Sequence, residues 1–346
     1  MKTIDKHNPQ RYVQEAGAVA RCSEWLNDAT LIVTGRRAWE SFAKRLENGT
    51  NVEPQIVQFA SQSELKHLVE VGTERSSKRV LVVGGGRAID VGKAAATLLN
   101  VPGIVVPTVF STDAPCSSLS VIYDEQQRPA EYLDHKQNPS QVIVDTDLLA
   151  EGPSRYFSAG VAGALSVFYE AEEIFASRRF HTANAMEGHV LMSAQWAKQR
   201  LLRLSESVCN DSLSDDGLND IYFICFWMTA DCFEHVGISL PHTIYRLLRG
   251  IGLSDVGGYL HGELVGLGLI CQTLLCPTHR VESPRIEQLV GRLLCDVDWA
   301  PLLETVTARR EEFLAQTERW PVTSNISAPL SAEALYNCIV DVAKRL

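Results

Sequence analysis

The sequence predicts a protein of two domains, in which an α/β amino-terminal domain with a parallel, Rossmann-like sheet precedes an all-helical carboxyl-terminal domain. Three observations support this prediction. The chain has 346 residues, more than one domain usually holds. Strands that are apolar throughout alternate with helical patterns over about the first 150 residues. After that point strand-like alternation is nearly absent. We expect the boundary between residues 152 and 153, giving domains over 1–152 and 153–346.

The amino-terminal domain contains a series of short, β-rich runs. We expect strands at 29–34, 54–59, 79–83, 103–108, 118–124 and 141–145. Helical patterns follow the first three of these runs, at about 38–46, 63–74 and 88–99. Strands without polar alternation indicate a parallel sheet that is covered on both faces. Such a sheet binds ligands at the carboxyl ends of its strands.

Helical patterns dominate from about residue 154 onward. We expect helices at 161–176, 183–205, 220–235, 243–248, 263–275, 286–295 and 332–346. The chain shows no internal repeat and no low-complexity tract. The carboxyl-terminal domain is therefore predicted to be a packed helical unit.

Composition and charge exclude several classes of protein. The formal net charge is −10 and no Lys/Arg cluster stands out, which argues against a nucleic-acid partner. The chain has no run of about 18 apolar residues, so we expect no membrane span. Its first residues lack the apolar core of a secretory signal. The nine cysteines form no CxxC pair, which is typical of reduced thiols in a cytoplasmic protein.

A glycine-rich turn is the strongest local signal. The run Gly84-Gly85-Gly86 lies between a buried strand and a helix. Glycine lets the backbone turn sharply and approach a ligand closely. The helix start then offers unpaired N–H groups and a positive dipole end to a pyrophosphate. The alternative is a turn that binds nothing. Asp90, which precedes Lys93 by three residues, is also explained by the helix dipole.

Two segments carry a resemblance to a known family. GGGRAIDVGKAAA (84–96) and VPTVFSTDAPCSSLSVIYDE (106–125) resemble stretches of the iron-containing alcohol dehydrogenase and glycerol dehydrogenase family, and NPQRYVQEAGAV (8–19) resembles its opening strand. The match runs in order along the whole chain and is densest between residues 79 and 125. The resemblance implies an NAD(P)-dependent oxidoreductase.

The resemblance also implies roles for single residues. It places Gly85, Gly86 and Arg87 along the cofactor pyrophosphate, and Thr108 and Ser111 beside the adenine-nucleotide portion. The implied cofactor site further includes Gly84, Asp90, Ser117, Leu119 and Tyr123, of which the last three approach the nicotinamide. Asp113 corresponds to a contact with a substrate hydroxyl, because a carboxylate accepts hydrogen bonds from two hydroxyls. The alternative for Asp113 is an Asx-turn before Pro115.

The end of the first apolar strand bears on the choice of cofactor. Many family members carry an Asp there for the adenosine ribose, whereas this chain has Thr34-Gly35 followed by Arg36 and Arg37. Guanidinium groups can bind a 2′-phosphate, and the missing carboxylate would not repel it. Gly35, Arg36 and Arg37 are therefore predicted to contact the cofactor and to favour NADP(H) over NAD(H). The alternative is two solvated arginines at a helix start.

The family's metal site is incomplete in this chain. The family holds Zn²⁺ or Fe²⁺ with one Asp and two His from the helical domain. SLPHTIYRLLRG matches the first His at His242, and YLHGELVGLGL matches the second at His261. The Asp position aligns with Gly163, which has no side chain. Two imidazoles alone form a weak site, since a catalytic metal normally takes three protein ligands.

Three explanations of this gap remain open. A third ligand could come from Glu170, Glu234 or His235, although Glu170 lies roughly 10 Å along the helix from Gly163. Alternatively, reduction could proceed without metal, with His242, His261 or Tyr245 as the general acid. Finally, redox chemistry could have been lost. We favour metal-independent or weakly metal-assisted reduction.

The sequence therefore predicts a cytoplasmic dehydrogenase or reductase that moves hydride between a nicotinamide cofactor and a small polar carbonyl, imine or alcohol. Asp113, His242 and His261 are the predicted catalytic residues, and the resemblance allows a homo-oligomer. One alternative is a cyclase or lyase like dehydroquinate synthase. Arg246 and Arg249 share a helix face with His242 and could hold the phosphate of its substrate. The other alternative is a non-catalytic nucleotide-binding protein, which the absent Asp makes credible.

Overall fold

The structure is a computed structural model of the chain, and it describes residues 8–46, 50, 52–124, 129–177, 185–253, 258–319 and 325–346. The chain divides into two compact units, Met1–Phe157 and Ser158–Leu346. The division falls within helix α5 (Ser154–Ser177). The sequence-based boundary lies a few residues earlier.

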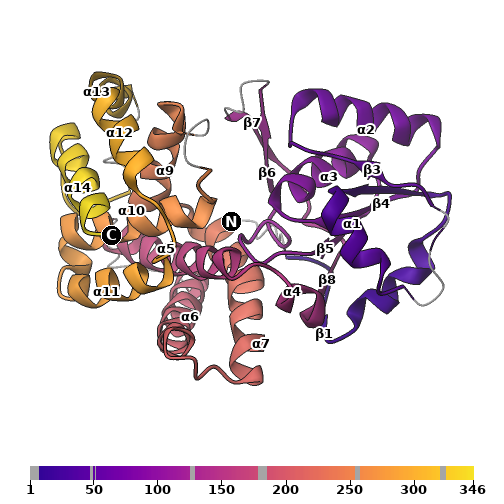
Figure 1. The fold of residues 1–346 in the computed structure, drawn as a ribbon, viewed down its shortest axis with the longest axis horizontal. Coiled ribbons are helices and arrows are strands. Elements are labelled where there is room, and N and C mark those ends of the chain that lie inside the picture. The colour runs from indigo at the N-terminus through magenta and orange to yellow at the C-terminus, as the bar shows by residue number, and fades with distance from the viewer. Residues whose placement is uncertain are drawn as a thin grey trace. The chain divides into compact units, whose positions relative to one another are not determined.

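A parallel sheet forms the centre of the first unit (Figure 1). Within the described residues, six strands pair in the order β1-β8-β5-β4-β2-β3, and every pair is parallel. The strands are β1 (Arg11–Glu15), β2 (Thr30–Thr34), β3 (Gln55–Ile56), β4 (Arg79–Gly84), β5 (Gly103–Pro107) and β8 (Gln141–Asp145). Together with the helices of the second unit, this sheet confirms the predicted fold class.

Helices cover both faces of the sheet. On one face, Ile32, Leu81, Ile104 and their neighbours share one core with η1 (Ala18–Trp25), α1 (Arg36–Ala43) and α4 (Thr146–Ala150). On the other face lie α2 (Gln62–Glu74) and α3 (Gly86–Leu99). A Cβ added to Gly92 of α3 would lie only 2.4 Å from Val82, so this helix packs directly on β4. Burial on both faces explains why the strands are apolar throughout.

A small antiparallel hairpin completes the first unit. It consists of β6 (Leu119–Tyr123) and β7 (Pro129–Asp134). Its first strand packs on α3, and the Tyr123 amide donates a hydrogen bond to the Ala60 carbonyl at 2.8 Å. The hairpin thereby ties the loop before it to the glycine-rich helix.

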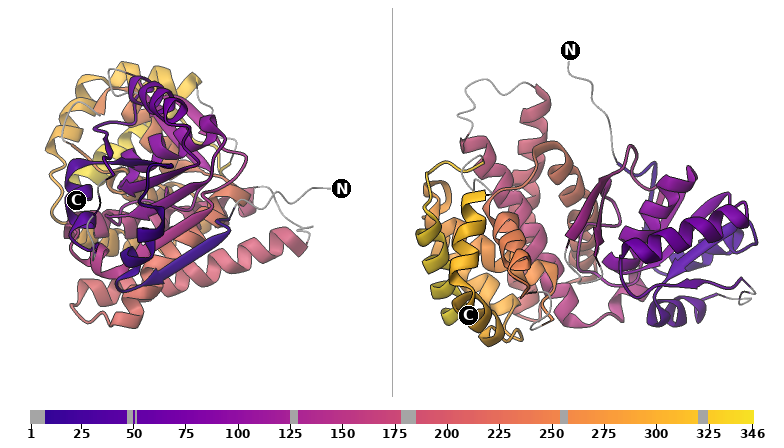
Figure 2. Two further views of the ribbon diagram at one scale, coloured as in Figure 1. Left: turned by 90° about the vertical axis from the view of Figure 1, so that its right-hand side faces the viewer. Right: turned by 90° about the horizontal axis from the view of Figure 1, so that it is seen from above.

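The described residues of the second unit form helices and no strand (Figure 2). After α5 the helices are α6 (Ala185–Cys209), α7 (Asp215–Phe223), α8 (Thr229–Val236), α9 (Leu240–Gly250), α10 (His261–Leu275), α11 (Ser283–Leu293), α12 (Ala300–Ala308), α13 (Arg310–Arg319) and α14 (Ala332–Arg345). The helix predicted over 220–235 is α7, a π-helical turn over Ile224–Met228 and α8. None of the described helices combines the length and the apolar character needed to cross a membrane.

Helices α5 and α10 approach each other backbone to backbone. A Cβ on Gly262 would overlap the Ala159 carbonyl, and one on Gly163 would lie 3.5 Å from Gly262 Cα. Ser166 Oγ donates a hydrogen bond across the crossing to the Val265 carbonyl at 3.2 Å. This crossing brings Gly163 next to the start of α10, where His261 is the first residue.

Candidate functional site

The carboxyl ends of β2 and β4 form the predicted cofactor site. From β2 the chain passes to the edge strand β3, whereas from β4 it passes to β5 on the other side, so the strand order reverses between β2 and β4. Open α/β sheets bind ligands at such a switch point. Gly35 and Gly85 directly precede the helices that follow these two strands, and neither helix has a side-chain cap. In the same unit, Ser61 caps α2 and Asp145 caps α4. The switch point therefore presents two uncapped helix starts.

The three glycines act through space and not through unusual backbone angles. Gly85 has φ −95° and ψ −173°, an extended conformation that any residue can adopt. The backbone angles at this position therefore do not require glycine. A Cβ on Gly84 would lie 2.8 Å from Ala88, and one on Gly85 would lie 2.7 Å from Val109. A Cβ on Gly86 would meet nothing nearer than Thr112, at 3.9 Å. Gly84 and Gly85 are required because a larger residue would collide with its neighbours. Gly86 instead leaves the space next to the helix start free of side-chain atoms.

Lys93 holds the loop that follows β5. The Lys93 residue is 4% exposed, and its ammonium donates hydrogen bonds to the carbonyls of Ala114 (2.8 Å), Ser117 (3.0 Å) and Leu119 (2.6 Å). Sequence reasoning noted Lys93 only as part of a motif and missed this role. A buried cation in an apolar helix face is the signal that could have revealed it.

Asp90 lies beside Lys93 on helix α3. Burial raises the pKa of the Asp90 carboxyl to about 7, while Lys93 and the Val121 amide lower it and Asp113 raises it further. The nearest carboxylate oxygen is 3.9 Å from the Lys93 ammonium. These contacts support the loop, and a contact between Asp90 and the cofactor stays a prediction.

The other predicted cofactor residues lie around the same sheet edge or in the loop beyond it. The Thr108 amide donates to the Gly84 carbonyl at 3.0 Å, which sets the two strand ends side by side. The Arg87 guanidinium lies 5.4 Å from the centre of the Phe59 ring. Arg36 and Arg37 are exposed, and among the residues that the structure describes no carboxylate pairs with either. The loop and hairpin after β5 carry Ser111, Asp113, Ser117, Leu119 and Tyr123.

The two predicted histidines lie together in the second unit. Their ring centres are 5.2 Å apart, and the Tyr245 ring meets His261 edge-on at 4.4 Å. Glu170 of α5 is fully buried against the start of α9. One of its oxygens accepts from the amides of Ser239 (2.8 Å) and His242 (3.1 Å), and the other accepts from His242 Nδ1 at 2.7 Å. Glu170 thus fixes the orientation of His242.

The environments of the two histidines differ. Burial lowers the pKa of His261 to about 3, and the positive charges of His242, Arg249 and Arg246 lower it further. His261 is therefore neutral at physiological pH. His242, by contrast, has the Glu170 carboxylate on one ring nitrogen.

The residues at this position do not fit the family's metal. Glu170 already accepts three hydrogen bonds, and His235 bonds within its own helix to the Asp231 carbonyl at 2.8 Å. Within the described ranges, no group of three or more His, Cys, Asp or Glu side chains could hold a metal ion. A pair of imidazoles falls short of the three protein ligands that a catalytic zinc takes.

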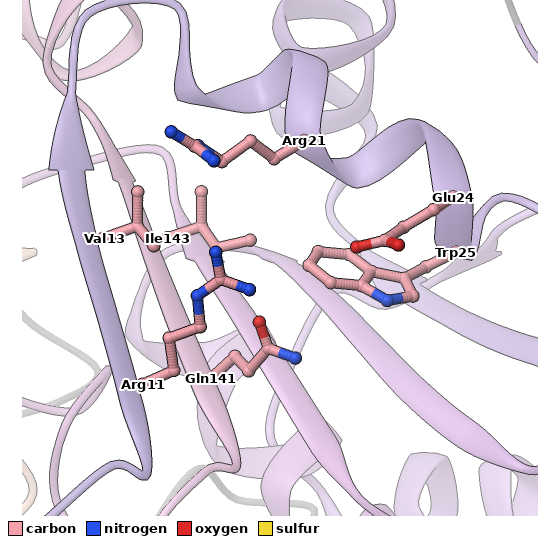
Figure 3. Close-up of a pocket in the computed structure, with 7 residues that line it drawn as sticks. All are labelled: Arg11, Val13, Arg21, Glu24, Trp25, Gln141 and Ile143. Atoms are coloured by element: carbon pink, nitrogen blue, oxygen red, sulfur yellow. The ribbon is translucent and has the colours of Figure 1, made fainter.

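A separate hollow lies at the opposite edge of the sheet (Figure 3). Its volume is ≈ 250 Å³, and its lining consists of Arg11, Val13, Arg21, Glu24, Trp25, Gln141 and Ile143. Arg11 and Gln141 are the first residues of β1 and β8, so the hollow lies at the amino ends of these parallel strands. It is therefore distinct from the predicted cofactor site at the carboxyl ends of β2 and β4.

Comparisons with known proteins agree with this geometry. The family model for iron-containing alcohol dehydrogenases matches residues 9–146. A glycerol dehydrogenase from Thermotoga maritima is 31% identical over 286 residues, which are 77% of this chain and 76% of that protein. One from Escherichia coli O6:H1 is 29% identical over 302 residues, covering 80% and 79% of the two chains. A solved structure, a probable glycerol dehydrogenase from Sinorhizobium meliloti, is 23% identical and shares the fold with a TM-score of 0.82, covering 98% of this chain and 99% of that one. The chain belongs to the iron-containing alcohol dehydrogenase family.

Proposed function

We propose that this protein is an NAD(P)-dependent oxidoreductase that interconverts a small polar carbonyl or imine with its reduced product, and that it transfers the proton through His242 without a metal. Family membership and relatives named glycerol dehydrogenase support the reaction class. The hydrogen bonds of Glu170 to His242 are the observation that carries the metal-independent part.

The first unit would hold the dinucleotide at its sheet edge. When bound, the nicotinamide supplies or accepts the hydride. Gly86 and the uncapped start of α3 suit the pyrophosphate, because the first-turn N–H groups lack a side-chain acceptor. The loop held by Lys93 carries the residues assigned to the nicotinamide end, together with Asp113 as the substrate-hydroxyl contact.

The exposed pair Arg36 and Arg37 supports a preference for NADP(H). Both follow the strand next to the glycine-rich turn, where a guanidinium can hold a 2′-phosphate. Substituting both with serine should raise the Michaelis constant for NADPH about tenfold or more and leave that for NADH within about threefold. Steady-state kinetics with both cofactors measures this. A wild-type preference for NADH would reject the NADP(H) part alone.

The proton would pass through His242. Glu170 accepts from Nδ1, so Nε2 is the nitrogen left to exchange a proton with the substrate. In reduction, His242 donates this proton to the oxygen or nitrogen as hydride reaches the carbon, and in oxidation it accepts the proton back. His261, which is neutral, would contact the same oxygen or nitrogen.

Turnover and metal content test this proposal together. Wild-type protein purified without chelator should reduce carbonyls from a panel while containing no stoichiometric metal, and His242→Gln should lower kcat about 100-fold or more. Gly163→Asp is an informative companion, because a Cβ there lies at an ordinary 3.5 Å from Gly262 Cα. It should gain about one zinc per chain by restoring three ligands. Stoichiometric metal in the wild type that is lost in His242→Ala would overturn the metal-free proposal.

A further inference from the structure

We infer that Phe59 and Glu64 are positioning residues that hold the Arg87 guanidinium in place for the cofactor pyrophosphate. The inference rests on the proposed function for the binding of the cofactor at the start of α3. It adds a role for the loop over residues 57–61, which follows β3 and contains none of the predicted cofactor residues.

Backbone hydrogen bonds hold both ends of this loop. The Val57 amide donates to the Thr34 carbonyl at 2.8 Å, so the chain runs beside β2 up to the carboxyl end of that strand. The Ala60 carbonyl accepts from the Tyr123 amide of β6, also at 2.8 Å. Residues 58 and 59 lie between these two hydrogen bonds and are held by a side chain.

Glu64 holds the middle of the loop. It is the third residue of α2, whose cap residue Ser61 accepts from the Glu64 amide at 3.2 Å. A carboxylate at this position of a helix usually turns back to the amide of the cap residue. Here its two oxygens accept from the Gln58 amide (2.8 Å) and the Phe59 amide (3.0 Å). Glu64 thereby fixes the backbone from which the Phe59 side chain extends.

The Phe59 ring lies against Arg87, the second residue of α3. The centre of the ring is 5.4 Å from the guanidinium carbon, within the range of a cation–π contact. Phe59 is 37% exposed and Arg87 is exposed as well, so the pair lies at the surface, next to the uncapped helix start. A cation–π contact does not consume the N–H donors of a guanidinium, which can still bind phosphate oxygens.

These contacts reduce the entropy that cofactor binding would cost. A long, exposed arginine side chain loses rotamer freedom when it binds a ligand. Phe59 restricts Arg87 before the cofactor binds, and Glu64 restricts Phe59 through the loop backbone. Both coenzymes carry the same pyrophosphate, so the gain in affinity should be equal for NADPH and NADH. This equality distinguishes the role of Phe59 from that of Arg36 and Arg37, whose predicted contact is the 2′-phosphate of NADPH alone.

A double-mutant cycle on coenzyme binding tests this inference. NADPH and NADH are titrated, without substrate, into wild type, Phe59→Leu, Arg87→Gln and the double variant, with coenzyme fluorescence as the signal. Phe59→Leu should raise both dissociation constants about threefold to tenfold. In the Arg87→Gln background the same change should have less than about a twofold effect. Phe59→Tyr, which keeps a ring, should stay within about twofold of wild type.

Three further variants separate positioning from stability. Glu64→Ala should weaken the binding of both coenzymes as Phe59→Leu does. Ser61→Ala removes the cap of α2 but leaves both contacts of the Glu64 carboxylate in place. It should lower the thermal midpoint of unfolding and leave both dissociation constants unchanged. Phe223→Leu removes another exposed ring, on α7, and should also leave them unchanged.

The results separate this inference from the proposed function. Losses of binding that are coupled between Phe59 and Arg87 support the inference, even if no carbonyl is reduced and the proposed function fails. Additive effects of the two changes, wild-type binding in Phe59→Leu, or an effect on NADPH alone overturns the inference and leaves the proposed function standing. Wild-type protein that binds neither coenzyme overturns both.

Discussion

Helices α3 and α9 present the same structural problem and solve it in opposite ways. The first-turn N–H groups of any helix lack partners within the helix. Helix α3 follows Gly85, which offers no side chain, and its start stays uncapped. Helix α9 follows Ser239, whose hydroxyl donates elsewhere, to the Asn325 carbonyl. Glu170 from α5 instead accepts from two amides at the start of α9.

The contrast separates two kinds of functional site. At α3 the binding groups are backbone amides that a ligand must complete, so a glycine motif can encode them locally. At α9 the amides are already satisfied, and the buried carboxylate that satisfies them also holds a histidine. The start of α3 is therefore available to a ligand, whereas the start of α9 holds a side chain that is positioned in advance.

Removing the carboxylate at α9 should have the largest effect. Glu170→Ala leaves two amides and an imidazole without their buried acceptor, and should lower the free energy of unfolding by about 3–5 kcal/mol. Urea denaturation measures the loss. The exposed Glu304 of α12 provides a matched control, since Glu304→Gln should change stability by less than about 0.5 kcal/mol.

The isosteric variant distinguishes positioning from support. Glu170→Gln keeps the shape and one acceptor, but removes the carboxylate that His242 Nδ1 contacts. We expect kcat to fall about 30-fold or more while the NADPH dissociation constant stays within about twofold of wild type. A variant with unchanged kcat would mean that Glu170 only supports the fold.

The glycines at α3 should separate packing from ligand binding. Gly84→Ala places a methyl group 2.8 Å from Ala88 and should destabilise the protein by about 1–3 kcal/mol. Gly86→Ala meets no close neighbour, so stability should change by less than about 1 kcal/mol. It should nevertheless weaken NADPH binding about tenfold, because the methyl group covers the open helix start. Wild-type affinity in Gly86→Ala would place the cofactor elsewhere.

At Asp90 the expected effect depends on pH. Its pKa is raised from the ordinary 3.8 to about 7, so the folded state holds this proton more tightly than the unfolded chain. The stability from this group is complete below about pH 4 and declines as the pH rises to about 7. Asp90→Asn should therefore gain on wild type by about 4 kcal/mol between pH 4 and pH 8. Denaturation curves at both pH values measure the change, and a constant difference would contradict the assignment.

The sequence patterns predicted those strands and helices that follow from the order of neighbouring residues. Runs such as RVLVV show the buried parallel strands directly, because both of their faces are apolar. The pattern at 220–235 indicated one helix but could not reveal its π-helical turn, where Phe223 and Trp227 stack. Helices α12 and α13 were not predicted. Helix α13 in particular has a weakly apolar sequence, REEFLAQTER, that periodicity does not mark.

Only part of the site was predicted, because the rest depends on contacts between residues that lie far apart in the chain. The family motifs pointed to His242 and His261, and the structure brings these residues together. Glu170 was considered only as a metal ligand, because helical spacing relates it to Gly163 on its own helix. Its actual partners lie about 70 residues further along the chain, and no local pattern connects them. The supporting role of Lys93 depends likewise on a loop that folds back over its helix.

The rate of carbonyl reduction by fully metal-depleted protein tests the central claim most directly. Protein is treated with a strong chelator, its metal content is verified by mass spectrometry, and NADPH oxidation is followed with a carbonyl substrate that the untreated protein reduces. We expect the rate to remain within about twofold of the untreated protein, because in the proposed mechanism His242, oriented by Glu170, exchanges the proton without a metal. A rate that falls to background and returns when zinc or iron is added would contradict the account.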